Sequence, residues 1–212
     1  MRAYRRGFQL MVMSVPAYYT AEMVRAMPDD GNIYEVVHGQ LLVTPAPRLW
    51  EEVAGRLFET IRAYLRQYPL GLAIGSRSDL SWGLRDVLVS PDLFVVPLEE
   101  ARQLDWLTLR TVLLAAEVLS PSSARADRFT KRRLYQERRL PLYWVIDPDA
   151  RFVEVWQPDD DFPRVERHQL VWMPAGGDQS FSLDLSELFR AIGAGIGPLL
   201  HPALRGRPGL LP

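Results

Sequence analysis

The chain has 212 residues, a formal net charge of −1 at pH 7, 48% hydrophobic and 24% charged residues, and no cysteine. This length suits one domain with a large buried core, and the composition excludes a disordered or fibrous protein. The lack of cysteine excludes a disulfide framework and a thiolate metal site, and the near-neutral charge excludes a surface that is basic throughout, although clustered arginines can still form a local basic stripe.

The first residues combine early arginines with a short apolar run that Gln9 and Ser14 interrupt. This run is too short for a secretory signal, and no stretch of the chain approaches the roughly 18 apolar residues of a membrane span. We therefore expect residues 1–17 to form a leader, with Met11 or Met13 as an alternative start. We also expect a cytoplasmic protein that does not contact a membrane.

The first half of the chain predicts a helix, a hairpin and a second, longer helix. Thr20 precedes a short amphipathic segment, which indicates a capped helix over 21–27. Two β-rich runs flank His38 and predict a hairpin over 33–44. Apolar residues then recur at helical spacing from 49 to 68, which predicts the long amphipathic helix of the chain.

Strands are predicted next, over 70–76 and 86–96, the second one broken by Pro91. The nearly continuous apolar run over 111–119 predicts a central strand that is covered on both faces. Glu117 is the one charged residue of this run.

The later elements are predicted in this order: a helix over 124–139, a buried strand over 142–147, an outer strand over 152–158 in which Val153 and Val155 alternate with Glu154 and Trp156, and further strands over 166–172 and 180–185. The order predicts a single mixed α/β domain over 18–190, with a central sheet flanked by helices, an additional N-terminal hairpin and C-terminal strands. Residues 191–212 are expected to be a C-terminal tail.

Three residues in this scheme could form a catalytic site. Glu117 needs a partner, because an ionised carboxylate inside an apolar strand is costly unless it is paired or bound to a metal. Asp92 lies at the mouth of another strand, and two carboxylates brought together favour a divalent cation. Lys131, on the following helix, is the only lysine among 25 basic residues, and arginine cannot replace a compact, adjustable charge. Two acids and a lysine around a hard cation can hydrolyse phosphodiester bonds.

Four segments resemble, in order and spacing, a bacterial family of putative restriction endonucleases, long catalogued as of unknown function, within the PD-(D/E)XK superfamily. They are YEVVHGQLLV, SPDLFVV, AEVLSPSSARADRFTKRRLYQERRLPLYWVIDP and FVEVWQP. The resemblance runs from about Thr20 to Leu185 and is strongest over 110–157. It implies a restriction-endonuclease-like fold, hydrolysis of DNA with Mg²⁺ or Mn²⁺ as cofactor, and a homodimer.

The resemblance places the aspartate of the superfamily on Asp92 and its second acid on Glu117. The lysine usually found two residues after that acid is replaced by Leu119. In this family a lysine on the next helix takes over, and it corresponds to Lys131. The resemblance thus assigns a catalytic role to Asp92, Glu117 and Lys131.

The resemblance also implies metal ligands beyond the two acids. The early glutamate of the family corresponds to Glu35, and the backbone carbonyl of Val118 is expected to help ligate the metal. Relatives often carry a histidine at the start of the long helix, where this chain has Trp50 or Glu51. The predicted metal set is therefore Asp92, Glu117, Glu35 and Val118.

Structural interpretations remain open for several residues. Asp127 and Lys131 have the i,i+4 spacing of a surface ion pair, which stabilises a helix by only ~0.3–0.5 kcal/mol. Glu35 could be an exposed hairpin residue, Tyr135 a core aromatic, and Asp79 a turn residue or a further acid near the metal. Five arginines of the predicted helix could form a solvated face or neutralise DNA phosphates: Arg128, Arg132, Arg133, Arg138 and Arg139.

Other kinds of catalytic site are excluded. His38, His168 and His201 are too scattered for a zinc site, and there is neither a glycine-rich phosphate loop nor a serine in a Gly-x-Ser-x-Gly context. Two functions without catalysis compete with the endonuclease. One is an inactive fold relative that acts as a nucleic-acid-binding or protein-interaction dimer. The other is a structural or regulatory dimer whose acids pair with arginines.

Overall fold

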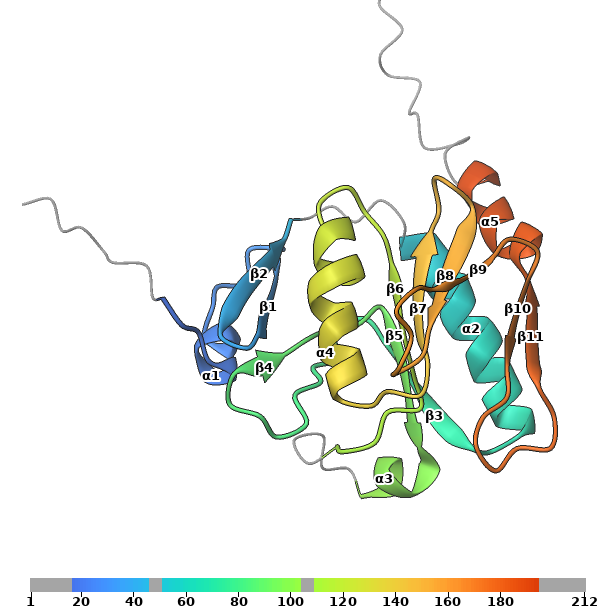
Figure 1. The fold of residues 1–212 in the computed structure, drawn as a ribbon, viewed down its shortest axis with the longest axis horizontal. Coiled ribbons are helices and arrows are strands. Elements are labelled where there is room, and N and C mark those ends of the chain that lie inside the picture. The colour runs from blue at the N-terminus through green and yellow to red at the C-terminus, as the bar shows by residue number, and fades with distance from the viewer. Residues whose placement is uncertain (1–16, 46–50, 104–108, 195–212) are drawn as a thin grey trace, which may run out of the picture.

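The computed structural model describes residues 17–45, 51–103 and 109–194 (Figure 1). Its helices are α1 (Ala21–Arg25), α2 (Glu51–Gln67), α3 (Leu98–Arg102), the π-helical segment η2 (Ala126–Lys131) continued by α4 (Arg132–Glu137), and α5 (Leu185–Ala194). Its strands are β1 (Ile33–Val37), β2 (Gln40–Thr44), β3 (Gly71–Gly75), β4 (Val87–Leu88), β5 (Leu93–Pro97), β6 (Leu114–Val118), β7 (Tyr143–Asp147), β8 (Phe152–Trp156), β9 (Arg164–Glu166), β10 (Gln169–Trp172) and β11 (Phe181–Asp184). No helix in the described ranges is long and apolar enough to cross a membrane.

The central sheet has six strands in the order β3-β5-β6-β7-β8-β9. Strands β6 and β7 run parallel, and the other neighbouring pairs are antiparallel. The predicted mixed α/β architecture is therefore confirmed. Strands β1, β2 and β4 form a separate three-stranded sheet, and β10 and β11 form a two-stranded one. These sheets correspond to the predicted N-terminal hairpin and C-terminal strands.

Strand β6 is the covered central strand that the apolar run predicted, and all five of its residues are buried. Successive side chains of a strand point to opposite faces of the sheet. Ala116 packs in the part of the core that contains the apolar residues of α2, whereas Ala115 packs in the part that contains those of α4. Glu117 is on the same face as Ala115 and is therefore directed toward the helix that carries Lys131. Figure 1 shows α2 and α4 on opposite sides of the sheet.

Helix α2 covers its face of the sheet with a stripe of four buried residues at helical spacing: Val53, Leu57, Ile61 and Leu65. Burying a side chain of this kind stabilises a protein by about 1.5–3 kcal/mol. The stripe therefore holds the helix firmly on the sheet and fixes the position of its first turn, which begins at Glu51.

The N-terminal hairpin has the tight turn that its sequence predicts. His38 and Gly39 both have positive φ values, 50° and 79°, as a two-residue type I′ turn requires. Strand β1 also pairs with β4, and the chain then passes through Pro91 into β5. The predicted break at Pro91 is thus the point where the chain leaves the hairpin sheet and enters the central sheet.

Strand β8 is not the outer strand that its alternating sequence predicted. It lies between β7 and β9, and Glu154 is buried. Arg128 Nε and Trp156 Nε1 donate hydrogen bonds to the Glu154 carboxylate at 2.7 and 3.1 Å, which compensates for the burial of its charge. The alternating sequence of β8 did not indicate Arg128 as a partner of Glu154, because Arg128 lies in η2.

The helix predicted over 124–139 is present, but its bonding is π-helical over Ala126–Lys131. Such segments are rare and occur frequently at functional sites. Helix α5 was not predicted, and it continues into the region assigned to the tail. The predicted leader up to residue 16 and the tail beyond residue 194 lie outside the described residues.

Candidate active site

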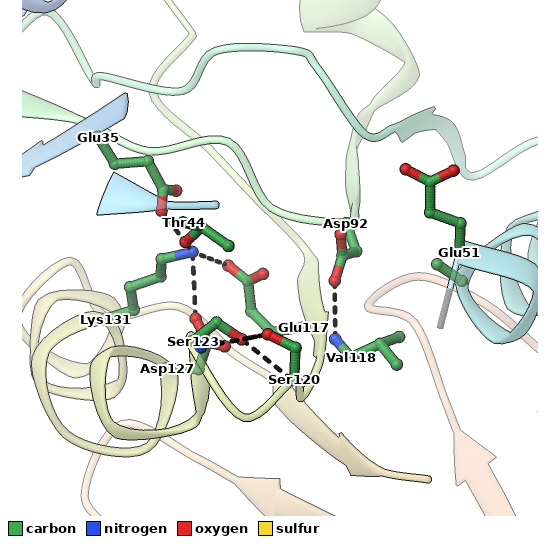
Figure 2. Close-up of a pocket in the computed structure, with 11 residues that line it drawn as sticks. Glu35, Thr44, Glu51, Asp92, Glu117, Val118, Ser120, Ser123, Asp127 and Lys131 are labelled. Atoms are coloured by element: carbon green, nitrogen blue, oxygen red, sulfur yellow. Dashed lines mark hydrogen bonds and ion pairs between the residues drawn. The ribbon is translucent and has the colours of Figure 1, made fainter. Parts of the chain in front are cut away.

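A pocket opens at the carboxyl end of β6 (Figure 2). Its walls come from the hairpin, the first turns of α2, the entry to β5, the end of β6 and the helix that follows. The lining residues are Glu35, Thr44, Glu51, Ala54, Asp92, Glu117, Val118, Ser120, Ser123, Asp127 and Lys131. The structure thus brings together every site residue that the sequence suggested: Asp92, Glu117, Lys131, Glu35 and Val118.

Lys131 is the centre of a buried ion cluster. Its side chain is only 4% exposed, and its Nζ lies 2.9 Å from Glu117 Oε1, 2.9 Å from Glu35 Oε2 and 3.1 Å from Asp127 Oδ1. The contact with Asp127 Oδ1 is an ion pair in a geometry that makes no hydrogen bond. The predicted pair of Asp127 and Lys131 therefore exists, but the surface interpretation is wrong, because both side chains are buried.

Asp92 lies where the chain enters β5, and its Oδ2 accepts a hydrogen bond from the Val118 N–H at 2.8 Å. This bond ties the beginning of β5 to the end of the neighbouring strand β6. Asp92 and Glu117 consequently line the pocket from adjacent strands. In the view of Figure 2, the Glu117 carboxylate lies between Lys131 and Asp92.

Glu35 is buried in the hairpin, and both of its carboxylate oxygens have protein partners. Oε1 accepts the Ser90 N–H at 2.7 Å, and Oε2 lies 2.9 Å from Lys131 Nζ. The interpretation of Glu35 as an exposed hairpin residue is therefore wrong, since its side chain is 2% exposed. Its contacts direct it toward the lysine, on the side away from Asp92 (Figure 2).

Two carboxylates that line the pocket, those of Asp92 and Glu117, are of the type that binds a hard divalent cation. Within residues 17–45, 51–103 and 109–194, no group of three or more His, Cys, Asp or Glu side chains is arranged to hold a metal ion. Asp92, Glu117 and Val118 nevertheless line one pocket, and carboxylate and carbonyl oxygens are the ligands that Mg²⁺ prefers. Mg²⁺ usually keeps several waters and takes only one or two carboxylates, so two acids suffice.

The ion cluster carries more negative than positive charge. With three carboxylates and one ammonium ionised, its net charge is −2. Burial raises the pKa of Glu117 well above its ordinary value of 4.5, and the nearby Asp127, Asp92 and Glu35 raise it further against the opposing effect of Lys131. Burial also raises the pKa of Glu35. The cluster therefore favours the uptake of a proton or of a further cation.

Lys131 itself stays protonated. Burial lowers its pKa, but Asp127, Glu117 and Glu35 together hold that pKa well above its ordinary value of 10.5. Lys131 is therefore an ammonium over the whole physiological range. It can donate hydrogen bonds and supply positive charge, and it cannot act as a general base.

The raised pKa of Glu117 predicts that the metal-free protein loses stability as the pH rises above about 4.5. Between the ordinary and the raised pKa, the folded state binds the proton more tightly than the unfolded state, so the free energy of unfolding falls with pH. Urea unfolding in EDTA between about pH 5 and pH 8 should show a shallower fall for Glu117→Gln than for the wild type. Glu59→Gln, on the exposed face of α2, is the control and should follow the wild type. Parallel curves for all three proteins would contradict the prediction.

Sequence reasoning did not place Tyr135 in the site. It is the buried core aromatic that was favoured, and its hydroxyl also donates to Glu117 Oε1 at 3.3 Å. Burial, with the added effect of Glu117, raises the pKa of Tyr135 well above 10.0, so the hydroxyl keeps its proton. Asp127, Lys131 and Tyr135 follow one another at intervals of four residues. That spacing on one helix face is the signal that could have identified all three.

The arginines of the same helix do not line the pocket. Arg128 donates to carboxylates on β7 and β8, Arg132 stacks over the ring of Trp156 at 4.6 Å, and Arg139 pairs with Asp159. The other two arginines of the predicted face are exposed. At least three of the five therefore have partners within the protein.

Two further predictions concern residues at or near the pocket. Asp79 does not line it and lies 3.6 Å from Arg25, so it is not a further acid of this pocket, and it does not lie in a turn either. Glu51 lines the pocket at the start of α2, where relatives often have a histidine. Trp50 lies outside the described residues.

The six-stranded mixed sheet flanked by helices has the architecture of a nuclease-like class of fold. The chain matches the Uma2 family, described as "Putative restriction endonuclease", over residues 21–188, and it belongs to this family. A solved structure described as a putative nuclease belonging to DUF820, from Anabaena variabilis ATCC 29413, is similar with a TM-score of 0.67 and 20% sequence identity. The similarity covers 82% of this chain and 99% of that one, and it supports the fold. None of the curated proteins matches the chain.

Proposed function

We propose that the protein is a metal-dependent endonuclease that hydrolyses the phosphodiester bonds of DNA in this pocket. The observation that carries the proposal is that the only lysine of the chain is buried 2.9 Å from Glu117, in a pocket that Asp92 also lines. Burying such charges seldom stabilises a protein more than apolar residues of similar volume would. Their retention is therefore better explained by chemistry. Membership of the family and the nuclease-like fold support the same class of reaction.

Asp92, Glu117 and the backbone carbonyl of Val118 would hold Mg²⁺, or Mn²⁺ in its place. When bound, the cation would polarise the scissile phosphate and lower the pKa of the attacking water. The excess negative charge of the cluster supports this assignment, because a divalent cation would relieve the repulsion between the carboxylates.

Lys131 would orient the attacking water or stabilise the negative charge that develops on the phosphate. Its raised pKa supports a role as a cation, since a protonated amine can donate but cannot accept a proton. Glu35 and Asp127 would position this ammonium from the side away from Asp92. We therefore propose that Glu35 positions Lys131 and does not ligate the metal, because its carboxylate contacts Lys131 and the Ser90 N–H.

The proposed substrate is duplex DNA, and a dimer would offer one active site to each strand. We accordingly propose a homodimer, which sedimentation equilibrium of the full chain would test by giving twice the chain mass of 24.3 kDa. A single 24.3 kDa species at working concentration would rule the dimer out.

Metal binding is tested by thermal unfolding with increasing Mg²⁺ or Mn²⁺. A ligand that binds only the folded state stabilises it by about 2.7 kcal/mol at 100 times its Kd, so the melting temperature of the wild type should rise with concentration. Asp92→Asn should lose this response. The control Asp79→Asn should keep it, because Asp79 does not line the pocket. An inactive scaffold held together by ion pairs predicts no response in any of the three proteins.

A further inference from the structure

A second pocket is lined by three arginines and shares no residue with the candidate active site. Arg151 lies in the turn between β7 and β8, Arg167 between β9 and β10, and Arg190 on α5. The other lining residues are Leu185, Ser186 and Phe189. We call this the arginine pocket. Three guanidinium groups around one cavity make it a local basic site on a chain whose net charge is −1.

Little of this positive charge is neutralised within the protein. Among the residues that the structure describes, Arg190 has a distant ion-pair partner, Glu187 at 3.9 Å, and neither Arg151 nor Arg167 forms an ion pair. The N–H of Ser186 is already bound by Asp184 Oδ1 at 2.7 Å, so the start of α5 is not the anion donor here. The guanidinium groups are therefore the groups available to an anion.

The two unpaired arginines are held in defined positions. Arg151 has a φ of 53°, a left-handed conformation that glycine or asparagine adopts more readily. Its turn is fixed by Asp147, whose Oδ1 accepts the Ala150 N–H at 2.8 Å. The Arg167 guanidinium lies over the ring of Phe152, 5.0 Å from its centroid. A strained backbone that carries a charged side chain at the rim of a cavity suggests a role for that side chain.

The arginine pocket and the candidate active site lie at the same end of the central sheet. Strands β6 and β7 run parallel and in register, so Val118 at the active site and the turn that carries Arg151 leave the sheet at one edge. Helix α2 also connects the two sites. Glu51 lines the active site, and Arg56 Nη1 donates to the Glu187 carbonyl on α5 at 3.1 Å. The five-residue step from Glu51 to Arg56 advances only about 7.5 Å along the helix.

We infer that the arginine pocket binds a backbone phosphate of the same DNA duplex whose scissile phosphate enters the candidate active site. The identity of the ligand rests on the proposed function. Guanidinium groups bind phosphate oxygens in a bidentate manner, and contacts to phosphates away from the reacting one fix the register and orientation of a duplex. The arginine pocket thus positions the substrate and takes no part in the chemistry.

The inference is tested by DNA binding in EDTA, where no cleavage occurs. The probe is a fluorescein-labelled duplex of about 25 base pairs, and its anisotropy is followed at several salt concentrations. Loss of one phosphate contact should lower the slope of log K against log salt by about one, which is roughly tenfold in affinity near 0.1 M salt. This result is expected for Arg151→Gly and for the double variant Arg151→Gly/Arg167→Ala. Arg102→Ala, on α3 at the opposite end of the molecule in Figure 1, should match the wild type.

Thermal unfolding separates a binding role from a structural one. Arg151→Gly should melt at the wild-type temperature or above it, because glycine relieves the left-handed strain.

Wild-type affinity and salt slope in both arginine variants would overturn the inference. Weaker binding of inorganic phosphate in both variants, with DNA binding unchanged, would also overturn it, by showing a site for small anions. If the arginine variants show the lower salt slope but the wild type does not cut DNA with Mg²⁺, the proposed catalysis fails and the phosphate contact stands. A wild type that does not bind the duplex overturns both.

Discussion

Lys131→Met is expected to lower the free energy of unfolding by about 3–5 kcal/mol. Methionine keeps most of the side-chain volume but removes the ammonium, so Glu35, Glu117 and Asp127 remain buried without their cation. Leaving buried charges uncompensated is far more destabilising than losing a surface ion pair. Urea unfolding at pH 7 in EDTA measures the change.

The control for this substitution is Arg133→Ala, an exposed position on the same helix, which should stay within about 0.5 kcal/mol of the wild type. The deficit of Lys131→Met should shrink at lower pH, because the carboxylates then take up protons in place of the ammonium. Adding Glu117→Gln should restore part of the stability, since it removes one of the uncompensated charges. Equal stability of Lys131→Met and the wild type would show that the lysine does not compensate these acids.

Glu117→Gln is expected to reduce DNA cleavage by a factor of about 10³ or more, which corresponds to a rise of about 4 kcal/mol in the activation barrier. The substitution removes one of the two carboxylates proposed to hold the cation, and it also removes an ion-pair partner of Lys131. It should not unfold the protein, because neutralising one acid reduces the −2 charge of the cluster. Plasmid nicking with Mg²⁺ or Mn²⁺ gives the rates, and urea unfolding checks the fold.

Glu59→Gln serves again as the control and should nick at the wild-type rate, since Glu59 lies on the exposed face of α2. The combination of lost cleavage with retained or increased stability distinguishes a catalytic acid from a structural one. The same residual nicking in the wild type, Glu117→Gln and Lys131→Met would indicate a contaminating nuclease and would contradict the proposed catalysis.

Elements with a strong local signal were predicted well. The turn at His38 and Gly39 needs only the residues of the hairpin itself, and the apolar run around Glu117 has the composition of a strand covered on both faces. The break at Pro91 was also visible, because proline cannot donate to a sheet ladder. The candidate site residues Glu117 and Lys131 could be named because Glu117 is costly in an apolar strand and because Lys131 is the only lysine of the chain.

The features that were missed depend on contacts between distant parts of the chain. Asp127 is buried beside Lys131, which contacts Glu35 of the hairpin and Glu117 of the central sheet, and no local pattern reports these partners. Glu154 was misplaced for the same reason, since its arginine partner belongs to another element. Helix α5 is the exception, because Leu185, Leu188 and Phe189 have the i, i+3, i+4 spacing of a helix face, and this local signal was overlooked.

The hydrogen bond and ion pair of Glu35 make the N-terminal hairpin, β1 and β2, part of the candidate active site. The lysine receives one of its three counter-charges from this hairpin, which forms its own sheet and meets the central one through the segment around Pro91. A local opening of that small sheet would withdraw the glutamate and release the amine, while the six-stranded sheet stayed folded. The proposed DNA cleavage would then be lost at a lower temperature than the main unfolding transition, and the melting point alone would overstate the range in which the candidate site stays assembled.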